Sequence, residues 1–419
     1  MTEEAEAAAR PAVVPLLEPR GGIPPVVADQ SALDEVVMRI AQGSGPDAVD
    51  AERASGYRYS QRAYLVQLRR SGAGSALIDP IACADLKPLS DVLADAEWVL
   101  HAANQDLPCL AGVGMKPQSL FDTELAARIA GYERVGLATM SELVLGHQLA
   151  KEHSAVDWSR RPLPESWLAY AALDVEILVD LRDALEGELT RQGKLSWVQE
   201  EFAAILNAPP APPRTDPWRR TSGIHRLRGR RQLAIVRELW EARDTLAVRR
   251  DIAPGRLLPD SAIIAAASTS PATPEALGRL PGWGGKSTRR LVTTMWPAVQ
   301  RALAMGDADL PRPSPPGDGP PPASRWQDRD PAAAERLVRT RAAVGAVAAE
   351  YGLPVENLVS PDLVRRITWS PPDPEPAAVA AALRAGGARE WQIGLVAPPL
   401  AAALAAEPAA PAEDAATGG

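Results

Sequence analysis

Acidic and phenolic side chains occur in three short segments at spacings that suit metal-dependent chemistry. Asp50 and Glu52 are separated by one residue in a segment that reads as extended, so both side chains would point to the same face. Tyr170 and Asp174 are four residues apart in a helical segment, where they would lie one turn apart on one face. Asp106 follows the segment His101-Ala-Ala-Asn-Gln. Together these residues would offer only oxygen ligands to a cation.

This set of side chains suits the hydrolysis of a phosphodiester. The reaction needs an activated water in line with the leaving oxygen, and two cations about 3.5–4 Å apart stabilise both oxygens. Magnesium and manganese prefer carboxylate oxygens. Taken singly, each motif has an ordinary structural role available to it: Asp106 could open a helix as its N-cap, and Tyr170 could be a core aromatic. The prediction of a metal site at Asp50, Glu52, Asp106 and Asp174 therefore depends on the fold bringing them together.

The segments that must position these residues follow an α/β pattern. Strands are predicted at 48–52, 63–68, 75–79 and 97–102, and a mostly helical stretch follows from 106 to 206. Three strands in quick succession, then alternation of strand and helix, indicate a mixed sheet with helices packed on it.

Proline-rich stretches divide the chain further, because neither a helix nor a strand continues through them. Beyond the α/β part the pattern is helical, and a weak repeat between 253–260 and 353–362 indicates two copies of one small helical module. Two ordinary helix–proline–helix turns would look the same. The predicted units are a disordered or extended N-terminal segment (1–30), the α/β domain (31–207), a linker (208–217), a helical module (218–306), a second linker (307–324), a second helical module (325–405) and a disordered tail (406–419).

The composition of the 419 residues, 46% hydrophobic and 23% charged, is that of a soluble globular protein, and no apolar run is long enough to span a bilayer. The N-terminus is acidic where a secretory signal would be basic, so we expect a cytoplasmic protein. The two cysteines, Cys83 and Cys109, have no metal-ligand spacing, and buried reduced thiols are expected.

Positive charge is concentrated in one region although the net charge is −8. Between Pro212 and Arg256 there are twelve arginines and five acidic residues, a local excess of seven positive charges. An RNA backbone would need such cations; the alternative is that these arginines form a solvated helical face.

Gly285-Lys-Ser matches the end of a phosphate-binding loop, but Leu280 stands in place of the first glycine of that motif. We therefore expect a turn between helices there. The predicted phosphate contacts are Arg226, Arg228, Arg230, Arg231 and Lys286.

Three segments, taken in order, resemble the exonuclease motifs of ribonuclease D, a family of DEDD-type 3′→5′ exonucleases of the tyrosine subclass. They are Val49-Asp-Ala-Glu, Val99-Leu-His-Ala-Ala-Asn-Gln-Asp-Leu and Tyr170-Ala-Ala-Leu-Asp-Val. The segment from Ser119 to Arg128 is also similar to that family. Residues 215–306 resemble a helicase-and-RNase-D C-terminal (HRDC) domain, and 325–405 resemble one faintly.

The resemblance implies an α/β, RNase H-like fold followed by an HRDC and an HRDC-like module. It also implies two divalent ions, Mg²⁺ or Mn²⁺, held by Asp50, Glu52, Asp106 and Asp174, with Tyr170 orienting the water and Glu52 helping to hold the 3′ nucleotide. Ala51 replaces the usual threonine of the first motif, and its side chain would point away from the metals. His101 is expected to pack near the site.

The function implied is a 3′→5′ exoribonuclease that releases nucleoside 5′-monophosphates. Its RNA partner would have a free 3′ end, as tRNA precursors and other structured RNAs do, and the protein is expected to be a monomer. Two alternatives stay open: a DNA-directed 3′→5′ exonuclease, and a non-catalytic RNA-binding protein that retains the fold.

Overall fold

The computed structural model describes residues 13–83, 85–150, 153, 155–210, 212–313 and 319–406, with backbone only at 286–289. Lys286 is the first residue of a helix, but its side chain lies outside the described part. The predicted tail lies outside it as well, except for Ala406. No helix within these ranges is long and apolar enough to cross a membrane.

A six-stranded mixed sheet forms the centre of the first domain, in the order β2-β5-β4-β3-β6-β7. The strands β3, β4 and β5 are antiparallel neighbours, whereas β6 and β7 run parallel to β3, and β2 runs parallel to β5. The strands are β2 (Val26–Val27), β3 (Ser44–Arg53), β4 (Ala63–Ser71), β5 (Gly74–Ile78), β6 (Glu97–Leu100) and β7 (Ser119–Asp122). A separate two-stranded sheet pairs β1 (Val14–Leu16) with β8 (His147–Leu149).

Helices pack on this sheet, as the pattern of the sequence predicts. The helix α6 contacts β3, β4 and β5, while α7 contacts β3 and β6 and α8 contacts β7. The helices of the domain are α1 (Gln30–Ala41), α2 (Lys87–Val92), α3 (Leu107–Ala111), α4 (Thr123–Ala130), α5 (Leu137–Met140), α6 (Glu165–Glu176), α7 (Leu178–Arg191) and α8 (Leu195–Asn207). The α/β class is therefore confirmed. Cys83 and Cys109 are both buried and free in this domain.

Four strands were missed by the sequence pattern: β1 and β2 lie in the N-terminal segment predicted as disordered or extended, and two more lie further along. The stretch from 106 to 206, predicted as mostly helical, contains β7 and β8. The predicted strand 97–102 ends at Leu100, because Ala102 adopts a left-handed conformation with φ of 62° that turns the chain away from the sheet.

The two helical modules repeat the same order of helices. Each has a long helix, then a single turn, then a helix of nine or ten residues, followed by two more helices. The first module contains α9 (Arg230–Arg250), α10 (Pro254–Leu257), α11 (Asp260–Thr269), α12 (Pro274–Gly278) and α13 (Lys286–Ala304). In the second, α14 (Trp326–Arg329) precedes α15 (Pro331–Glu350), α16 (Val355–Leu358), α17 (Pro361–Trp369), α18 (Pro376–Ala385) and α19 (Glu390–Ala405).

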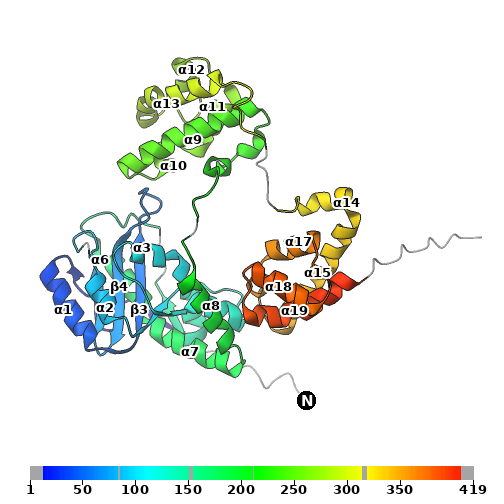
Figure 1. The fold of residues 1–419 in the computed structure, drawn as a ribbon. Coiled ribbons are helices and arrows are strands. Elements are labelled where there is room, and N and C mark those ends of the chain that lie inside the picture. Colours follow the sequence, from blue (N-terminus) through cyan, green and yellow to red (C-terminus); the bar gives the residue numbers. More distant parts are fainter. Residues whose placement is uncertain are drawn as a thin grey trace, which may run out of the picture.

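The second module packs on the α/β domain (Figure 1). Trp391 of α19 stacks on Trp197 of α8 with ring centres 5.0 Å apart, and its indole N–H donates to Glu201 at 3.1 Å. Arg389 also forms an ion pair with Glu201 at 3.3 Å. Their buried residues form one continuous apolar cluster, whereas the first module has an apolar core of its own.

Candidate metal and catalytic site

The central strand of the sheet carries the first two acidic residues of the site. Asp50 and Glu52 lie on β3, opposite Gln67 and Leu65 of β4. Side chains two residues apart share a face of a strand, so the two carboxylates point to the same side. Between them Ala51 is buried and points to the other face, as expected for the residue that replaces threonine.

The helix α6 brings the third carboxylate to this face. Asp174 and Tyr170 lie one turn apart on α6, close enough for each side chain to influence the pKa of the other. One carboxylate oxygen from each of Asp50, Glu52 and Asp174 lies within 4.8 Å of the other two. These acids come from segments more than one hundred residues apart, and the convergence that the metal prediction requires is therefore present for these three.

Asp106 faces the same cavity from a different element. It follows the 3₁₀ turn Ala103–Gln105 and precedes α3, and its carboxylate lies 3.7 Å from the Arg53 guanidinium. Arg53 also donates to the side chain of Gln105 at 3.4 Å. A cavity of about 560 Å³ is lined by all four acids together with Tyr170, His101 and Arg53. Asp106 thus lines the same cavity with an arginine as its partner, whereas the group of ligand oxygens within 4.8 Å of one another includes only the other three acids.

Arg53 and Gln105 had no role in the sequence prediction. The sequence did hint that Arg53 lies near the site, because Arg53 directly follows Glu52 at the end of the predicted strand. Arginine at the end of a strand is common on protein surfaces, however, and the position of Arg53 beside Asp106 depends on the pairing of β3 with β6.

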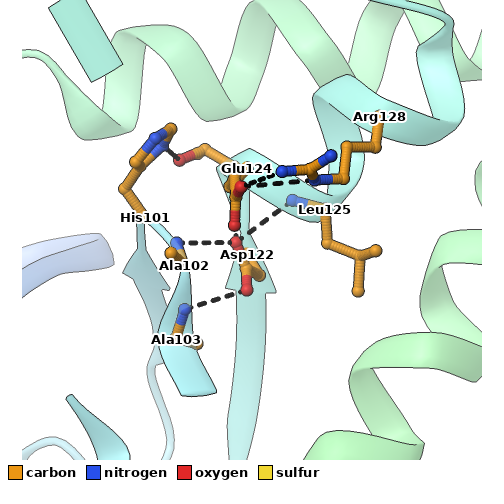
Figure 2. Close-up of polar contacts among 8 residues, drawn as sticks. His101, Ala102, Ala103, Asp122, Glu124, Leu125 and Arg128 are labelled. Carbon is orange, nitrogen blue, oxygen red and sulfur yellow. Dashed lines mark hydrogen bonds and ion pairs between the residues drawn. The ribbon is translucent and has the colours of Figure 1, made fainter. Parts of the chain in front are cut away.

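A buried aspartate fixes the turn that carries Asp106 (Figure 2). Asp122, at the end of β7, accepts hydrogen bonds from the backbone N–H groups of Ala102 at 3.0 Å and Ala103 at 2.9 Å. It also caps α4 by accepting from the N–H groups of Glu124 and Leu125. One carboxylate therefore joins β7, α4 and the turn after β6. This is the structural role of the segment from Ser119 to Arg128, for which the sequence showed only a resemblance to the family.

His101 packs beside the site, as expected. Its Nδ1 lies 2.9 Å from the Thr123 hydroxyl, and burial lowers the pKa of the imidazole to about 4. A neutral ring in this position helps to hold the end of β6 against α4.

The protein environment makes the four carboxylates hard to ionise together. Burial raises the pKa of Asp50 to about 6, and burial together with the charge of Asp50 raises the pKa of Asp106 to about 8. The pKa values of Glu52 and Asp174 lie well above their usual range, first because of burial and then because of Asp50. The pKa of the Tyr170 phenol is raised by burial and by the neighbouring charges, so the hydroxyl stays protonated at neutral pH.

A divalent cation fits this cluster on chemical grounds. The cluster offers only carboxylate oxygens, which are hard ligands, and a bound cation would relieve both the repulsion and the cost of burying the charges. The residues present can therefore hold a divalent metal ion.

The arginines predicted to bind phosphate do not share one environment. Arg226 and Arg228 are exposed on the surface of the first module. Arg230 donates to the backbone carbonyls of Leu310 and Pro311. Arg231 donates to the carbonyl of Ala302 at 2.9 Å near the end of α13. The last two arginines therefore hold the C-terminal part of their own module.

Family models match three parts of the chain. Residues 24–190 match a 3′-5′ exonuclease domain, residues 232–299 match an HRDC domain, and residues 319–404 match a 3′ to 5′ exonuclease C-terminal domain. The third match covers the second helical module and describes it as the C-terminal domain of an exonuclease.

Curated relatives extend the match across these domains. A ribonuclease D of Acidiphilium cryptum is 39% identical over 292 residues, covering 66% of this chain and 71% of the relative. The chain belongs to the ribonuclease D family of 3′-5′ exoribonucleases. A ribonuclease D of Granulibacter bethesdensis is also 39% identical, over 56% of this chain and 61% of the relative.

Two solved structures cover more of the chain. A protein from Bifidobacterium adolescentis is 39% identical with a TM-score of 0.86, over 93% of this chain and 99% of that one. The ribonuclease D of Escherichia coli, described as an exoribonuclease involved in structured RNA processing, has 25% identity and a TM-score of 0.66, covering 91% and 98% of the two chains. The similarity therefore includes both helical modules as well as the exonuclease domain.

Proposed function

We propose that the protein removes nucleotides one at a time from the 3′ end of RNA and releases nucleoside 5′-monophosphates. The observation that carries the proposal is the approach of Asp50, Glu52 and Asp174, with ligand oxygens within 4.8 Å of one another, in a chain of the ribonuclease D family. We expect two ions, Mg²⁺ or Mn²⁺, because phosphodiester hydrolysis places charge on both the attacking and the leaving oxygen.

The four carboxylates would hold these ions, with Asp106 joining the other three from across the cavity. When bound, the ions would activate the attacking water and stabilise the charge that develops on the phosphate oxygens. Glu52 is mostly buried at 9% exposure, and its carboxylate lies near those of Asp50 and Asp174, which supports a role in holding an ion; by resemblance to the family we expect it to contact the terminal nucleotide as well. Arg53 adds a fixed positive charge beside Asp106, close to where a phosphate would enter.

Tyr170 would orient the attacking water. Its phenol remains protonated because burial and nearby carboxylates raise its pKa. The phenolic oxygen can still accept a hydrogen bond from a water molecule. We therefore assign Tyr170 the role of positioning the attacking water.

Structured RNA with a free 3′ end, such as a tRNA precursor, is the proposed substrate. The Escherichia coli relative is described as acting in structured RNA processing, and the exposed Arg226 and Arg228 offer two cations to a phosphate backbone. Binding through phosphates carries little base specificity and weakens with salt. We further propose that the protein acts in the cytoplasm as a monomer.

Paired digests of matched RNA and DNA oligonucleotides, with and without Mn²⁺, test this function. We expect stepwise shortening of the RNA from its 3′ end, and no cleavage by Asp174→Asn, which keeps the size of the side chain but removes its charge. RNA affinity and thermal unfolding of this variant should remain near those of the wild type. Equal cleavage of DNA would favour the DNA-directed alternative, and RNA binding without cleavage by the wild type would favour the non-catalytic one.

A further inference from the structure

The loop that follows the first acidic motif is held by the first helical module. This loop, residues 54–62, joins β3 to β4 and starts two residues after Glu52. Figure 1 shows it rising from the sheet toward α9 and α10. Its contacts with the module fall into two groups, one at Tyr59 and Ser60 and the other at Gly56 and Tyr57.

Asp251 makes the first group of contacts. This residue directly follows α9 and caps it in a left-handed conformation with φ of 47°. It accepts a hydrogen bond from the backbone N–H of Ser60 at 2.8 Å and one from the hydroxyl of Tyr64 at 3.4 Å. Nearby, the Tyr59 hydroxyl donates to Asp244 at 3.2 Å, and the Tyr59 ring packs against the apolar core of the module.

Arg256 makes the second group, closer to the active site. Its Nε donates to the backbone carbonyl of Gly56 at 2.8 Å, and its guanidinium lies 3.8 Å from the centre of the Tyr57 ring. The backbone N–H of Ala253 donates to the carbonyl of Tyr57 at 3.0 Å. Three contacts of different kinds therefore fix two consecutive residues of the loop.

The inner side of the loop reaches the catalytic residues. Tyr57 packs against the apolar cluster that also contacts Tyr170, and its hydroxyl donates to the carbonyl of Ala155 at 3.5 Å. A cavity of about 280 Å³ is lined by Tyr57 together with Glu52 and Arg53. Movement of Tyr57 would thus change the wall beside Glu52 and loosen the packing around Tyr170.

We propose that Asp251 and Arg256 are positioning residues for the nuclease reaction, acting through the 54–62 loop on Glu52 and Arg53. The first helical module then has a role in the chemical step in addition to any contact with RNA. This inference rests on the proposed exonuclease function. The cation over the Tyr57 ring and the hydrogen bonds to the backbone are strong enough to favour one conformation of the loop. Small displacements of catalytic groups lower the rate of the chemical step strongly.

The test uses the full chain with Arg256→Ala and Asp251→Ala, which remove the side-chain partners of the loop. Steady-state kinetics on a short single-stranded RNA should show kcat lowered about tenfold with little change in KM. Hydrogen–deuterium exchange should rise in peptides that cover 54–62. Arg249→Ala removes the same charge from an exposed position on α9 and should change neither quantity. Arg256→Lys keeps a cation near the Tyr57 ring and should restore part of the lost kcat.

Two results would overturn the inference. One is faster exchange in the loop with an unchanged kcat, which would mean that the loop position does not matter for chemistry. The other is unchanged exchange in the loop in both variants, which would mean that the contacts do not hold it. Failure of the proposed function would look different, because the wild-type chain itself would then leave RNA intact.

Discussion

Replacement of Asp122 by alanine tests how the turn that carries Asp106 is held. The substitution removes the acceptor of four backbone N–H groups, two in the turn after β6 and two in the first turn of α4. Ala103 is fully buried, so its N–H would lose its partner without gaining water. Asp106 lies three residues further along and would lose its fixed position.

The magnitude follows from these contacts. An unsatisfied buried N–H costs about 1–3 kcal/mol, and loss of an N-cap costs about 1 kcal/mol. The half-buried N–H of Ala102 adds a smaller amount because water can reach it. Together the free energy of opening this region should fall by about 3 kcal/mol, which corresponds to about hundredfold faster exchange of its protected amides.

Hydrogen–deuterium exchange of peptides that cover 97–125 measures this effect locally, which matters because a chain with several domains does not unfold in one step. We expect faster exchange in Asp122→Ala and a kcat on RNA lowered about tenfold or more. Asp95→Ala removes an exposed aspartate from the same domain and serves as the control. Wild-type exchange and wild-type kcat in Asp122→Ala would refute the reasoning.

Three further outcomes are expected. Burial raises the folded-state pKa values of Asp50 and Asp106 to about 6 and about 8, so the metal-free protein should lose stability as pH rises from about 4 to about 8. Mn²⁺ should therefore raise the melting temperature more at pH 8 than at pH 5. A melting temperature that does not change with pH would contradict this. Tyr170→Phe should lower kcat about a hundredfold while Mn²⁺ affinity, measured by calorimetry, stays the same; an unchanged kcat would remove the phenol from the reaction. The double variant Arg226→Ala, Arg228→Ala should bind RNA more weakly, and the slope of log K against log salt concentration should fall by about two. Binding isotherms at several salt concentrations measure this slope. An unchanged slope would exclude phosphate contacts at these two residues.

The parts of the site that lie within one element could be predicted from the sequence. Asp50 and Glu52 share a face because a strand repeats every two residues, and Tyr170 and Asp174 share one because a helix repeats every 3.6. Their meeting depends on the strand order that places β3 between β4 and β6 and on the packing of α6 over β3. Periodicity carries no information on that order, and the likeness to the ribonuclease D motifs supplied it.

Other features depended on contacts between distant segments. The strand β7 has four residues and three of them are buried, so it shows no alternation of apolar and polar side chains. Arg230 and Arg231 lie in a basic run that indicates a nucleic-acid surface, yet their partners are carbonyls about seventy to eighty residues further along the chain. Such partners become visible only when the module is folded.

The most direct test of the central claim is a Mn²⁺ titration of the wild-type chain and of Asp50→Asn, followed by electron paramagnetic resonance. The clustered carboxylates predict two bound ions per wild-type chain and loss of at least one of them in the variant, with thermal unfolding little changed. Wild-type protein that binds no Mn²⁺, or an Asp50→Asn variant that binds it as the wild type does, would contradict the assignment of this cluster as the metal site.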